Sequence, residues 1–273
     1  MSTLYLVATP IGNLEDITQR ALRILGQVDL IAAEDTRHTA KLLNHYEIES
    51  PLTSFHEHSK PGKLQRLLKH LDQGDLALVS DAGTPVLNDP GYELVRGAIE
   101  AGHEVSPIPG PSAPISALIA SGLPADRFLY LGYLPRKSSE RRQAVREVAA
   151  LPYTLIFFET PHRLLESLQD LLEELGDRDL VIAREISKLH EEFYRGQISS
   201  ALAHFADHPP RGEITLVLAG SLPEVKTWSK EELLAGIKER RSQNMPPAQI
   251  ASQLSAESNW PRREIYQLII EMD

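Results

Sequence analysis

Acidic and basic side chains stand next to one another directly after the apolar segment 28–33. The residues there that could accept a proton or hold a phosphate are Glu34, Asp35, Arg37 and His38. A carboxylate or an imidazole can take the proton from a hydroxyl nucleophile, and an arginine can bind a phosphate through paired N–H groups. The same string could equally begin a helix, with Thr36 as its N-cap and the acids stabilised by the helix dipole. The sequence leaves open which residue takes the proton.

Four further segments combine glycine and proline with small polar residues at the ends of predicted strands. They are residues 8–14, 80–85, 109–113 and 158–163. Loops at the carboxyl ends of strands are where α/β proteins place their ligands. Each segment by itself could be an ordinary turn, because glycine and proline are common in turns.

Several familiar ligand motifs are absent. No G-x-G occurs among the 16 glycines, which argues against a Rossmann dinucleotide site, and Gly62-Lys63 lacks the upstream glycine of a P-loop. The chain has no cysteine, which excludes disulfides, thiolate zinc sites and cysteine nucleophiles. His56, Glu57 and His58 are possible metal ligands, but a third ligand would have to converge on them, so we predict a solvated loop and no metal.

The overall composition is that of a globular protein with an acidic balance. The chain has 273 residues, of which 42% are hydrophobic and 24% charged, and its formal net charge is −10. This length favours about two domains. No apolar run is long enough to span a bilayer, so we expect a cytoplasmic protein that makes no membrane contact. The negative charge opposes general nucleic-acid binding, and any RNA contact must use local basic patches.

Short apolar runs alternate with amphipathic helical segments, which predicts the α/β class. Residues 1–123 are expected to form an N-terminal α/β domain with strands at 4–8, 28–33, 76–79 and 104–108. Residues 124–221 are expected to form a C-terminal α/β domain with strands at 128–131, 155–159, 180–184 and 214–219. Residues 222–273 are expected to be a linker followed by a small helical domain.

The order and spacing of the four glycine- and proline-containing segments resemble the tetrapyrrole methylase superfamily, the class III methyltransferases that use S-adenosylmethionine. The strings TPIGNL, AAEDTR and VSDAGTP are similar to its branch of ribosomal small-subunit RNA 2′-O-methyltransferases. The resemblance covers nearly the whole chain. It implies two α/β domains with the cofactor in the cleft between them, a homodimer, and a helix-turn-helix-like appendage. The implied substrate is the 2′-hydroxyl of a cytidine in the decoding region of 16S rRNA within the small ribosomal subunit.

The resemblance also implies a set of cofactor contacts, carried over by position. From the first domain these are Pro10, Asp81, Gly83, Thr84, Pro85, Leu87, Ser112 and Ala113, and from the second Phe158, Glu159, Ala183, Gly212, Glu213 and Ile214. Thr84 departs from the Gly-Asp-Pro turn of other family members, so we expect a backbone contact there. Because the string AAEDTR belongs to the resemblance, we favour a catalytic role for residues 34–38 over a purely structural one.

Basic residues gather in three places that could contact RNA phosphates. The candidates are Lys60, Lys63, Arg66 and Lys69; then Arg136, Lys137, Arg141 and Arg142; and finally Arg262 and Arg263. The second group lies in residues 134–150, where five basic residues and two acids leave a local charge of +3. Each group could also be an ordinary solvated helix face.

Two other functions remain open. A tetrapyrrole methyltransferase would need a wide apolar cleft, and a non-enzymatic RNA-binding or assembly module would have no affinity for the cofactor.

Overall fold

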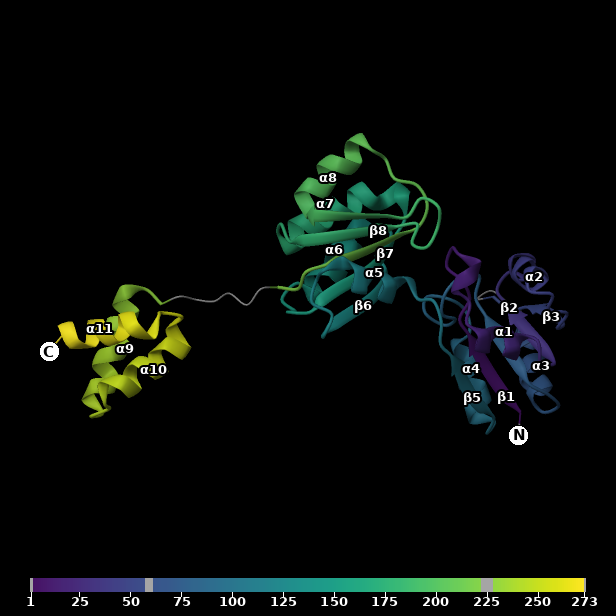
Figure 1. Cartoon of the computed structure of the whole chain (residues 1–273), viewed down its shortest axis with the longest axis horizontal. Helices are drawn as coiled ribbons and strands as arrows, with labels where there is room; N and C mark the ends of the chain where they lie inside the picture. Colours follow the sequence, from purple (N-terminus) through teal and green to yellow (C-terminus); the bar gives the residue numbers. More distant parts are fainter. Residues whose placement is uncertain (1, 57–60, 222–227, 273) are drawn as a thin grey trace. The chain divides into compact units, whose positions relative to one another are not determined.

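The computed structural model describes residues 2–56, 61–221 and 228–272. The chain divides into two compact units, Met1–Ser221 and Leu222–Asp273. The first unit contains two five-stranded sheets, each with its own helices (Figure 1). Within the described ranges, no helix has the length and hydrophobicity needed to cross a membrane.

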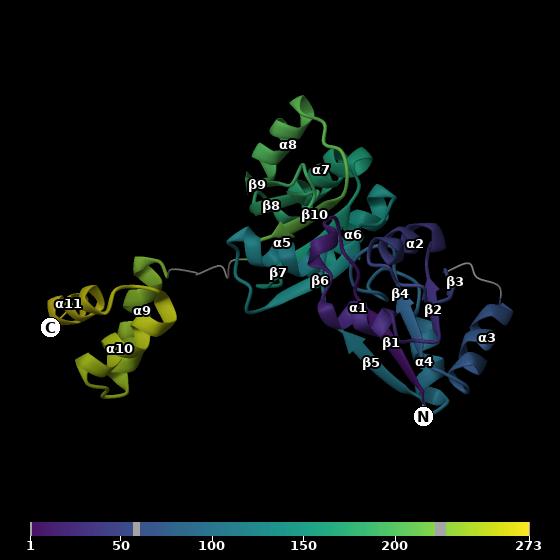
Figure 2. The same ribbon diagram turned by 45° about the vertical axis from the view of Figure 1, so that its right-hand side comes forward.

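The first sheet is entirely parallel and has the order β3-β2-β4-β1-β5. Its strands are β1 (Thr3–Val7), β2 (Leu30–Ala33), β3 (Leu52–Ser54), β4 (Leu76–Val79) and β5 (Glu104–Ile108). The segments that connect them hold η1 (Leu14–Asp16), α1 (Gln19–Leu25), α2 (Thr36–His45), α3 (Pro61–Leu71) and α4 (Tyr92–Glu100), as Figure 2 shows from a second side.

Alternation along β4 explains why helices cover both faces of this sheet. Ala77 and Val79 pack into the core that includes α1 and α2, whereas Leu76 and Leu78 pack into the core that includes α3 and α4. All four side chains are buried, as expected for a central parallel strand. The loops after β1, β2, β4 and β5 therefore emerge along one edge of the sheet.

The second sheet is mixed and has the order β6-β7-β10-β8-β9. Its strands are β6 (Phe128–Tyr133), β7 (Thr154–Glu159), β8 (Asp179–Arg184), β9 (Glu192–Gln197) and β10 (Ile214–Leu218). One face packs against α6 (Ser138–Val148), α7 (Leu164–Leu175), which follows η2 (Pro161–Arg163), and α8 (Ile198–Asp207). The other face packs against α5 (Ala113–Ser121) through Ala117 and Leu118. The sequence places α5 in the first α/β domain, yet it packs on the second sheet.

The unit Leu222–Asp273 is a small helical body. It contains α9 (Lys230–Ser242), α10 (Pro247–Ser258) and α11 (Arg262–Glu271) around its own core, whose members include Leu233, Ile250 and Ile265. The Ser229 hydroxyl and the Glu232 carboxylate form a reciprocal capping box that begins α9.

The α/β class and all the predicted strands are confirmed, with end positions shifted by a few residues. Two strands were missed, β3 and β9, because Leu52–Ser54 is short and Glu192–Gln197 is polar on a sheet edge. Thr36 is the first residue of α2 rather than its cap. The cap is Asp35, whose side chain accepts a hydrogen bond from the Arg37 backbone N–H.

A buried ion pair ties α6 to α7. Arg141 is 1% exposed, and its guanidinium donates to Asp170 Oδ2 at 2.7 Å from Nε and 2.6 Å from Nη2. It also donates to the carbonyl oxygens of Pro135 and Arg136. Both charges are almost fully buried. Removal of either partner would leave the other charge buried without compensation, which lowers the free energy of unfolding.

We expect Arg141→Met to destabilise the protein by about 3–5 kcal/mol, since it leaves the Asp170 carboxylate buried and unpaired. Lys137→Met, which removes an exposed cation paired with Glu140, should cost less than about 1 kcal/mol. Urea denaturation followed by circular dichroism measures both. Equal losses in the two variants would show that burial of the Arg141 pair contributes nothing special.

Candidate active site

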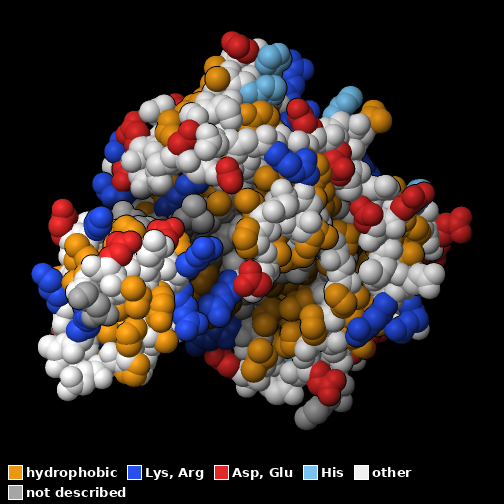
Figure 3. Space-filling view, turned by 60° about the vertical axis from the view of Figure 1, so that its left-hand side comes forward, with side chains coloured by type: hydrophobic (Ala, Val, Ile, Leu, Met, Phe, Trp, Pro, Cys, Tyr) orange, Lys and Arg blue, Asp and Glu red, His pale blue; other side chains and the backbone are white. Residues whose placement is uncertain are grey.

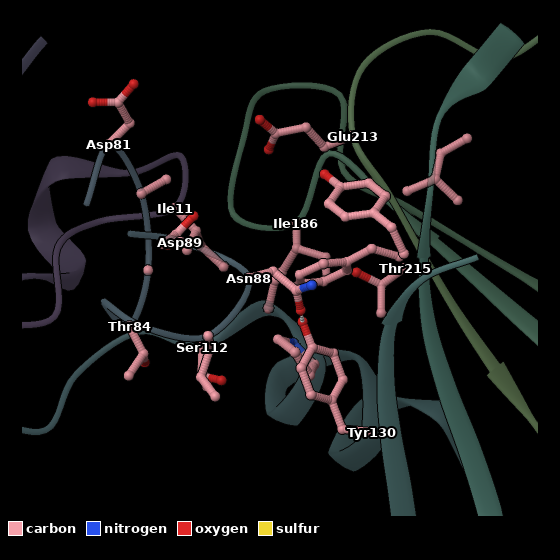
Figure 4. Close-up of a pocket in the computed structure, with 18 of the residues that line it drawn as sticks. Ile11, Asp81, Thr84, Asn88, Asp89, Ser112, Tyr130, Ile186, Glu213 and Thr215 are labelled. Atoms are coloured by element: carbon pink, nitrogen blue, oxygen red, sulfur yellow. Dashed lines mark hydrogen bonds between the residues drawn. The ribbon is translucent and has the colours of Figure 1, made fainter. Parts of the chain in front are cut away.

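A cavity of about 420 Å³ lies between the two sheets of the first unit. Its walls come from the loops after β1, β2 and β4, from the start of α5, and from β6, β7, β8 and β10 (Figure 4). The first sheet thus contributes loop ends, and the second contributes side chains that project from its strands. Residues more than a hundred positions apart in the sequence, such as Thr84 and Thr215, face the same space.

Hydrogen bonds fix the loops of the first sheet to one another. Thr9 and Gly83 each donate a backbone N–H to the other's carbonyl, at 2.9 and 3.0 Å. The Thr9 hydroxyl donates to the Ser80 carbonyl at 3.2 Å, and the Thr84 hydroxyl donates to the Pro111 carbonyl at 3.2 Å. Gly83 has φ +77°, a left-handed conformation that glycine adopts without strain. The glycine of the 80–85 segment is therefore required by the turn itself.

Three carboxylates lie close together on the first-sheet side. The Asp81 backbone N–H donates to Glu34 Oε2 at 3.4 Å, and Asp81 Oδ1 accepts the Asp35 backbone N–H at 2.9 Å. Burial raises the pKa of the Glu34 carboxyl above its ordinary range. Burial also raises the pKa of Asp89 to about 6, and the negative charges of Glu34 and Asp81 add to this effect.

The charge of the lining is one-sided. Four carboxylates, those of Glu34, Asp81, Asp89 and Glu213, border the cavity, and none of the described residues that line it is a lysine or an arginine. A ligand rich in phosphate would be repelled by such a surface. A ligand that carries positive charge would be attracted, since Coulomb interactions are strong where water is partly excluded.

Aromatic side chains form the wall on the second-sheet side. The Phe158 ring lies 5.4 Å from the rings of both Tyr130 and Tyr133, measured between centroids. The Tyr130 hydroxyl donates to Asn88 Oδ1 at 2.5 Å, as drawn in Figure 4. Burial raises the pKa of both tyrosines, so their hydroxyls stay protonated at neutral pH. Flat apolar faces beside hydrogen-bond donors suit a heteroaromatic ring.

Most of the residues that the sequence assigned to the cofactor line this cavity. They are Asp81, Gly83, Thr84, Leu87, Ser112, Ala113, Phe158, Ala183, Glu213 and Ile214. Pro10, Pro85, Glu159 and Gly212 are not among the lining residues. Pro10 lines a second cavity, and Gly212 is exposed.

Glu159 is the clearest correction among the predicted cofactor contacts. Its side chain is fully buried and accepts hydrogen bonds from the Arg163 guanidinium and the Ser167 hydroxyl. The carboxylate therefore fixes the 158–163 turn onto α7 and does not face the cavity. Its backbone neighbour Phe158 is the member of this motif that does.

The catalytic candidates that follow β2 separate in space. Only Glu34 lines the main cavity, and His38 lines the second cavity. The Asp35 carboxylate binds the Arg37 guanidinium at 2.6 Å, and this pairing holds the pKa of Asp35 well below its usual range. The side chain of Arg37 is 89% exposed.

Several lining residues were not predicted from the sequence, including Asn88, Asp89, Tyr130 and Tyr133. A signal for the first two was present, because Asn88-Asp89-Pro90-Gly91 is a turn-forming string and Asn88 adopts φ +63°. The tyrosines gave no local signal, since alternation in a strand does not tell which face meets a ligand.

The residues predicted to contact RNA differ from one another in burial and in ion pairing. Arg141 is buried and cannot reach a phosphate, which overturns that assignment. Arg142 binds the carboxylates of Glu173 and Glu174 on α7, so part of the local charge of +3 is neutralised by a neighbouring helix. Arg136 and Lys137 remain exposed.

The other two basic groups lie on α3 and α11. Arg66 and Lys69 are exposed on α3, while Lys63 donates to the Thr53 hydroxyl and is half-buried. Arg262 and Arg263 are exposed at the start of α11. Lys60, together with Glu57 and His58, lies outside the described residues. Among the side chains that are described, no group of three or more His, Asp or Glu could hold a metal ion.

Residues 3–202 match the family model of Tetrapyrrole (Corrin/Porphyrin) Methylases. The chain is 49% identical over its whole length to Ribosomal RNA small subunit methyltransferase I of Synechocystis sp., covering 99% of that protein. The protein of the same name from Thermotoga maritima is 50% identical over 81% of this chain and 99% of its own.

Solved structures share the fold at much lower identity. A diphthine synthase superimposes with a TM-score of 0.63 at 15% identity, covering 81% of this chain and 91% of its own. A uroporphyrin-III-C-methyltransferase from Thermus thermophilus has a TM-score of 0.56 at 21% identity, covering 80% of this chain and 94% of its own.

The chain belongs to the tetrapyrrole methylase family, and it is a methyltransferase whose methyl donor is S-adenosylmethionine. The cavity fits this donor. A sulfonium and an ammonium bring positive charge to the four carboxylates, and the adenine ring finds aromatic and apolar surfaces. The cavity volume lies in the range of small-molecule sites, roughly 300–1,000 Å³.

We expect the affinity for S-adenosylmethionine to depend on the charge of Asp89. A cationic ligand favours the ionised carboxylate, so binding should weaken as pH falls through about 6. From pH 7 to pH 5 a single such group gives about a tenfold rise in Kd. In Asp89→Asn this part of the pH dependence should disappear, whereas Asp16→Asn, an exposed control, should keep it. Isothermal titration calorimetry at several pH values measures these Kd values. If the pH dependence of the Kd in Asp89→Asn equals that of the wild type, Asp89 is not the group responsible.

Proposed function

We propose that this enzyme transfers the methyl group of S-adenosylmethionine to the ribose 2′-hydroxyl of a cytidine in the decoding region of 16S rRNA, acting on the small ribosomal subunit in the cytoplasm. The observation that carries the proposal is the 49% identity over the whole chain to a ribosomal RNA small subunit methyltransferase I. The acidic cavity supports it, because that surface suits a cationic methyl donor and leaves the RNA to be bound elsewhere.

The reaction requires no covalent intermediate between the substrate and the protein. When bound, the cofactor supplies a methyl carbon already activated by its sulfonium. The protein must hold the 2′-oxygen in line with that carbon, which is largely a matter of positioning. As the new O–C bond forms and the carbon–sulfur bond breaks, the hydroxyl proton must also leave, and Glu34 is the carboxylate among residues 34–38 that borders the cavity. We propose Glu34 as the proton acceptor.

RNA recognition would use exposed basic residues rather than the protein's overall charge. Arg37 beside the β2 loop, Arg66 and Lys69 on α3, and Arg136 and Lys137 before α6 are exposed. The exposed Arg262 and Arg263 offer a further phosphate contact on the helical unit. A tetrapyrrole substrate is less well supported, since the solved relatives that act on one share only the fold.

The direct test is methyl transfer to small ribosomal subunits that lack the modification. The wild-type enzyme should produce 2′-O-methylcytidine, detected by nucleoside mass spectrometry after digestion. Glu34→Gln should lower kcat by about 10²–10⁴, the usual contribution of a general base, and should weaken cofactor binding by no more than about tenfold, since it also removes one of the four cavity carboxylates. Asp16→Asn serves as the exposed control. Methylation of a base, of another RNA, or of no RNA at all would contradict the proposal, and full activity of Glu34→Gln would remove Glu34 alone.

We also propose that the protein is a homodimer, because two helices carry apolar side chains on faces turned to solvent. Ile115 and Ile119 of α5 are 43% and 74% exposed, and Tyr92 and Ile99 of α4 are 66% and 60% exposed. The spacings of four and seven residues put each pair on one helix face. In the space-filling view, groups of hydrophobic side chains, coloured orange, are exposed on the surface that faces the viewer (Figure 3). Such faces are typical of interfaces between subunits.

Ile119→Asp should therefore convert the dimer to a monomer, since it places a charge in an apolar contact. Light scattering coupled to gel filtration gives the mass of the particle, 30.4 kDa for one chain. Leu189→Asp is the matched control, because Leu189 is 93% exposed on a loop after β8 and lies on neither helix. A wild-type protein that runs as a monomer would contradict the dimer.

A further inference from the structure

A second cavity, of about 240 Å³, lies beside the first, and Asp81 lines both. Its walls are built from the loop after β1, from η1, from one side of α2 and from the end of β4. The site described above does not use this space. Its position is informative, because a ligand here and a ligand in the main cavity would meet at Asp81.

The walls of the second cavity combine apolar surface with a basic rim. Pro10, Leu14 and Leu42 supply apolar surface, and Thr39 is buried. His38 and Lys41 are exposed side chains of α2 that border the opening. A flat apolar ligand attached to a phosphate matches both features, since the ring can lie on the apolar walls while the phosphate meets the cation of Lys41.

Hydrogen bonds within the protein hold the walls of this cavity in place. Thr9 is fixed through its hydroxyl to the Ser80 carbonyl, and the Asp81 carboxylate accepts the backbone N–H of Asp35, the cap of α2. Both bonds join segments about seventy or fifty positions apart in sequence. The cavity is therefore part of the fold itself. Because its walls are already ordered, the protein loses little conformational entropy when a ligand binds there.

We propose that this second cavity binds the pyrimidine nucleoside that is to be methylated, turned out of its RNA stack, with its ribose directed toward Asp81 and the main cavity. The inference rests on the proposed function and goes beyond it by locating the substrate nucleotide. The cavity volume admits a single nucleoside and leaves no room for a base pair. Turning the nucleotide out of its stack exposes its base for stacking on the apolar walls and for contacts to its edges, as in recognition of single-stranded RNA, and presents its ribose to the main cavity.

The arrangement also explains why Pro10 and His38 do not line the main cavity. Pro10 was expected to touch the cofactor, and His38 was a catalytic candidate, yet both face the second cavity. The strings around Thr9, Asp35 and Asp81, which carry the resemblance to RNA methyltransferases, all contribute to it or to its support. The nucleoside site thus accounts for residues that the cofactor site leaves without a role.

Filling the cavity is the first test. Thr39→Met extends a side chain from α2 into the empty space, and it should lower kcat/KM for the small ribosomal subunit about a hundredfold or more, as expected for a displaced substrate. The Kd for S-adenosylmethionine should stay within about threefold of wild type, because the main cavity is untouched. Ala40→Met, on the same helix but outside both cavities, is the control and should keep its activity. Unchanged kcat/KM in a folded Thr39→Met protein would overturn the proposal.

A binding measurement on the wild-type protein keeps the inference testable even if Thr39→Met fails to fold. Cytidine 5′-monophosphate, added in the presence of S-adenosylhomocysteine, should shift the NMR signals of the Leu14 and Leu42 methyl groups. Shifts confined to residues of the main cavity, or no shifts at millimolar nucleotide, would overturn it. If the wild type binds the nucleotide here but methylates no ribosomal RNA, the proposed function fails and the nucleoside site survives. If it methylates the RNA but shows no such shifts, the reverse holds.

Discussion

The pair of backbone hydrogen bonds between Thr9 and Gly83 is the contact on which both cavities depend. It joins the ends of β1 and β4, which are neighbours in the first sheet, at the point where their loops turn away. On one side of this junction lies the main cavity, lined by Gly83 itself, and on the other lies the second cavity, lined by Thr9. A side chain at position 83 would strain the left-handed turn and disturb both at once. The short bridge therefore sets the distance between the cofactor and the proposed nucleoside.

Charge is divided sharply over small distances in this protein. The main cavity is lined by carboxylates, while the cations of Arg37 and Lys41 lie on α2, only a few residues from Glu34. A protein of net charge −10 can thus attract a cationic cofactor inside and a polyanion outside. Formal net charge alone would have suggested that RNA is repelled. The local distribution matters more, because salt screens the exposed charges beyond about 10 Å.

The fold could be predicted from sequence because its signals are local: apolar runs mark the strands, and turn-forming strings mark the loops. The residues predicted to contact the cofactor came from the family resemblance, and most of them line the main cavity. Arg141 could not be interpreted in this way: its partner Asp170 lies 29 positions ahead on another helix, and only packing shows that the pair is buried. The contact between Tyr130 and Asn88 spans 42 positions and two sheets, so neither residue alone indicates it. These features could not be predicted because they depend on contacts between residues that are far apart in the sequence.

The crossing from the first sheet to α5 has a mechanical consequence. Within residues 2–56 and 61–221, the chain passes from one sheet to the body of the other only once, through the stretch 109–112 between β5 and α5. Pro109 and Pro111 have φ fixed by their rings, so this stretch can turn only through its remaining backbone torsions. Gly110 lies against Ala8, whose side chain a Cβ at position 110 would approach to 3.0 Å, so a larger residue there would push the connection away from β1. The covalent link between the two halves is thus short and closely packed, which limits how far one sheet can turn relative to the other about this point.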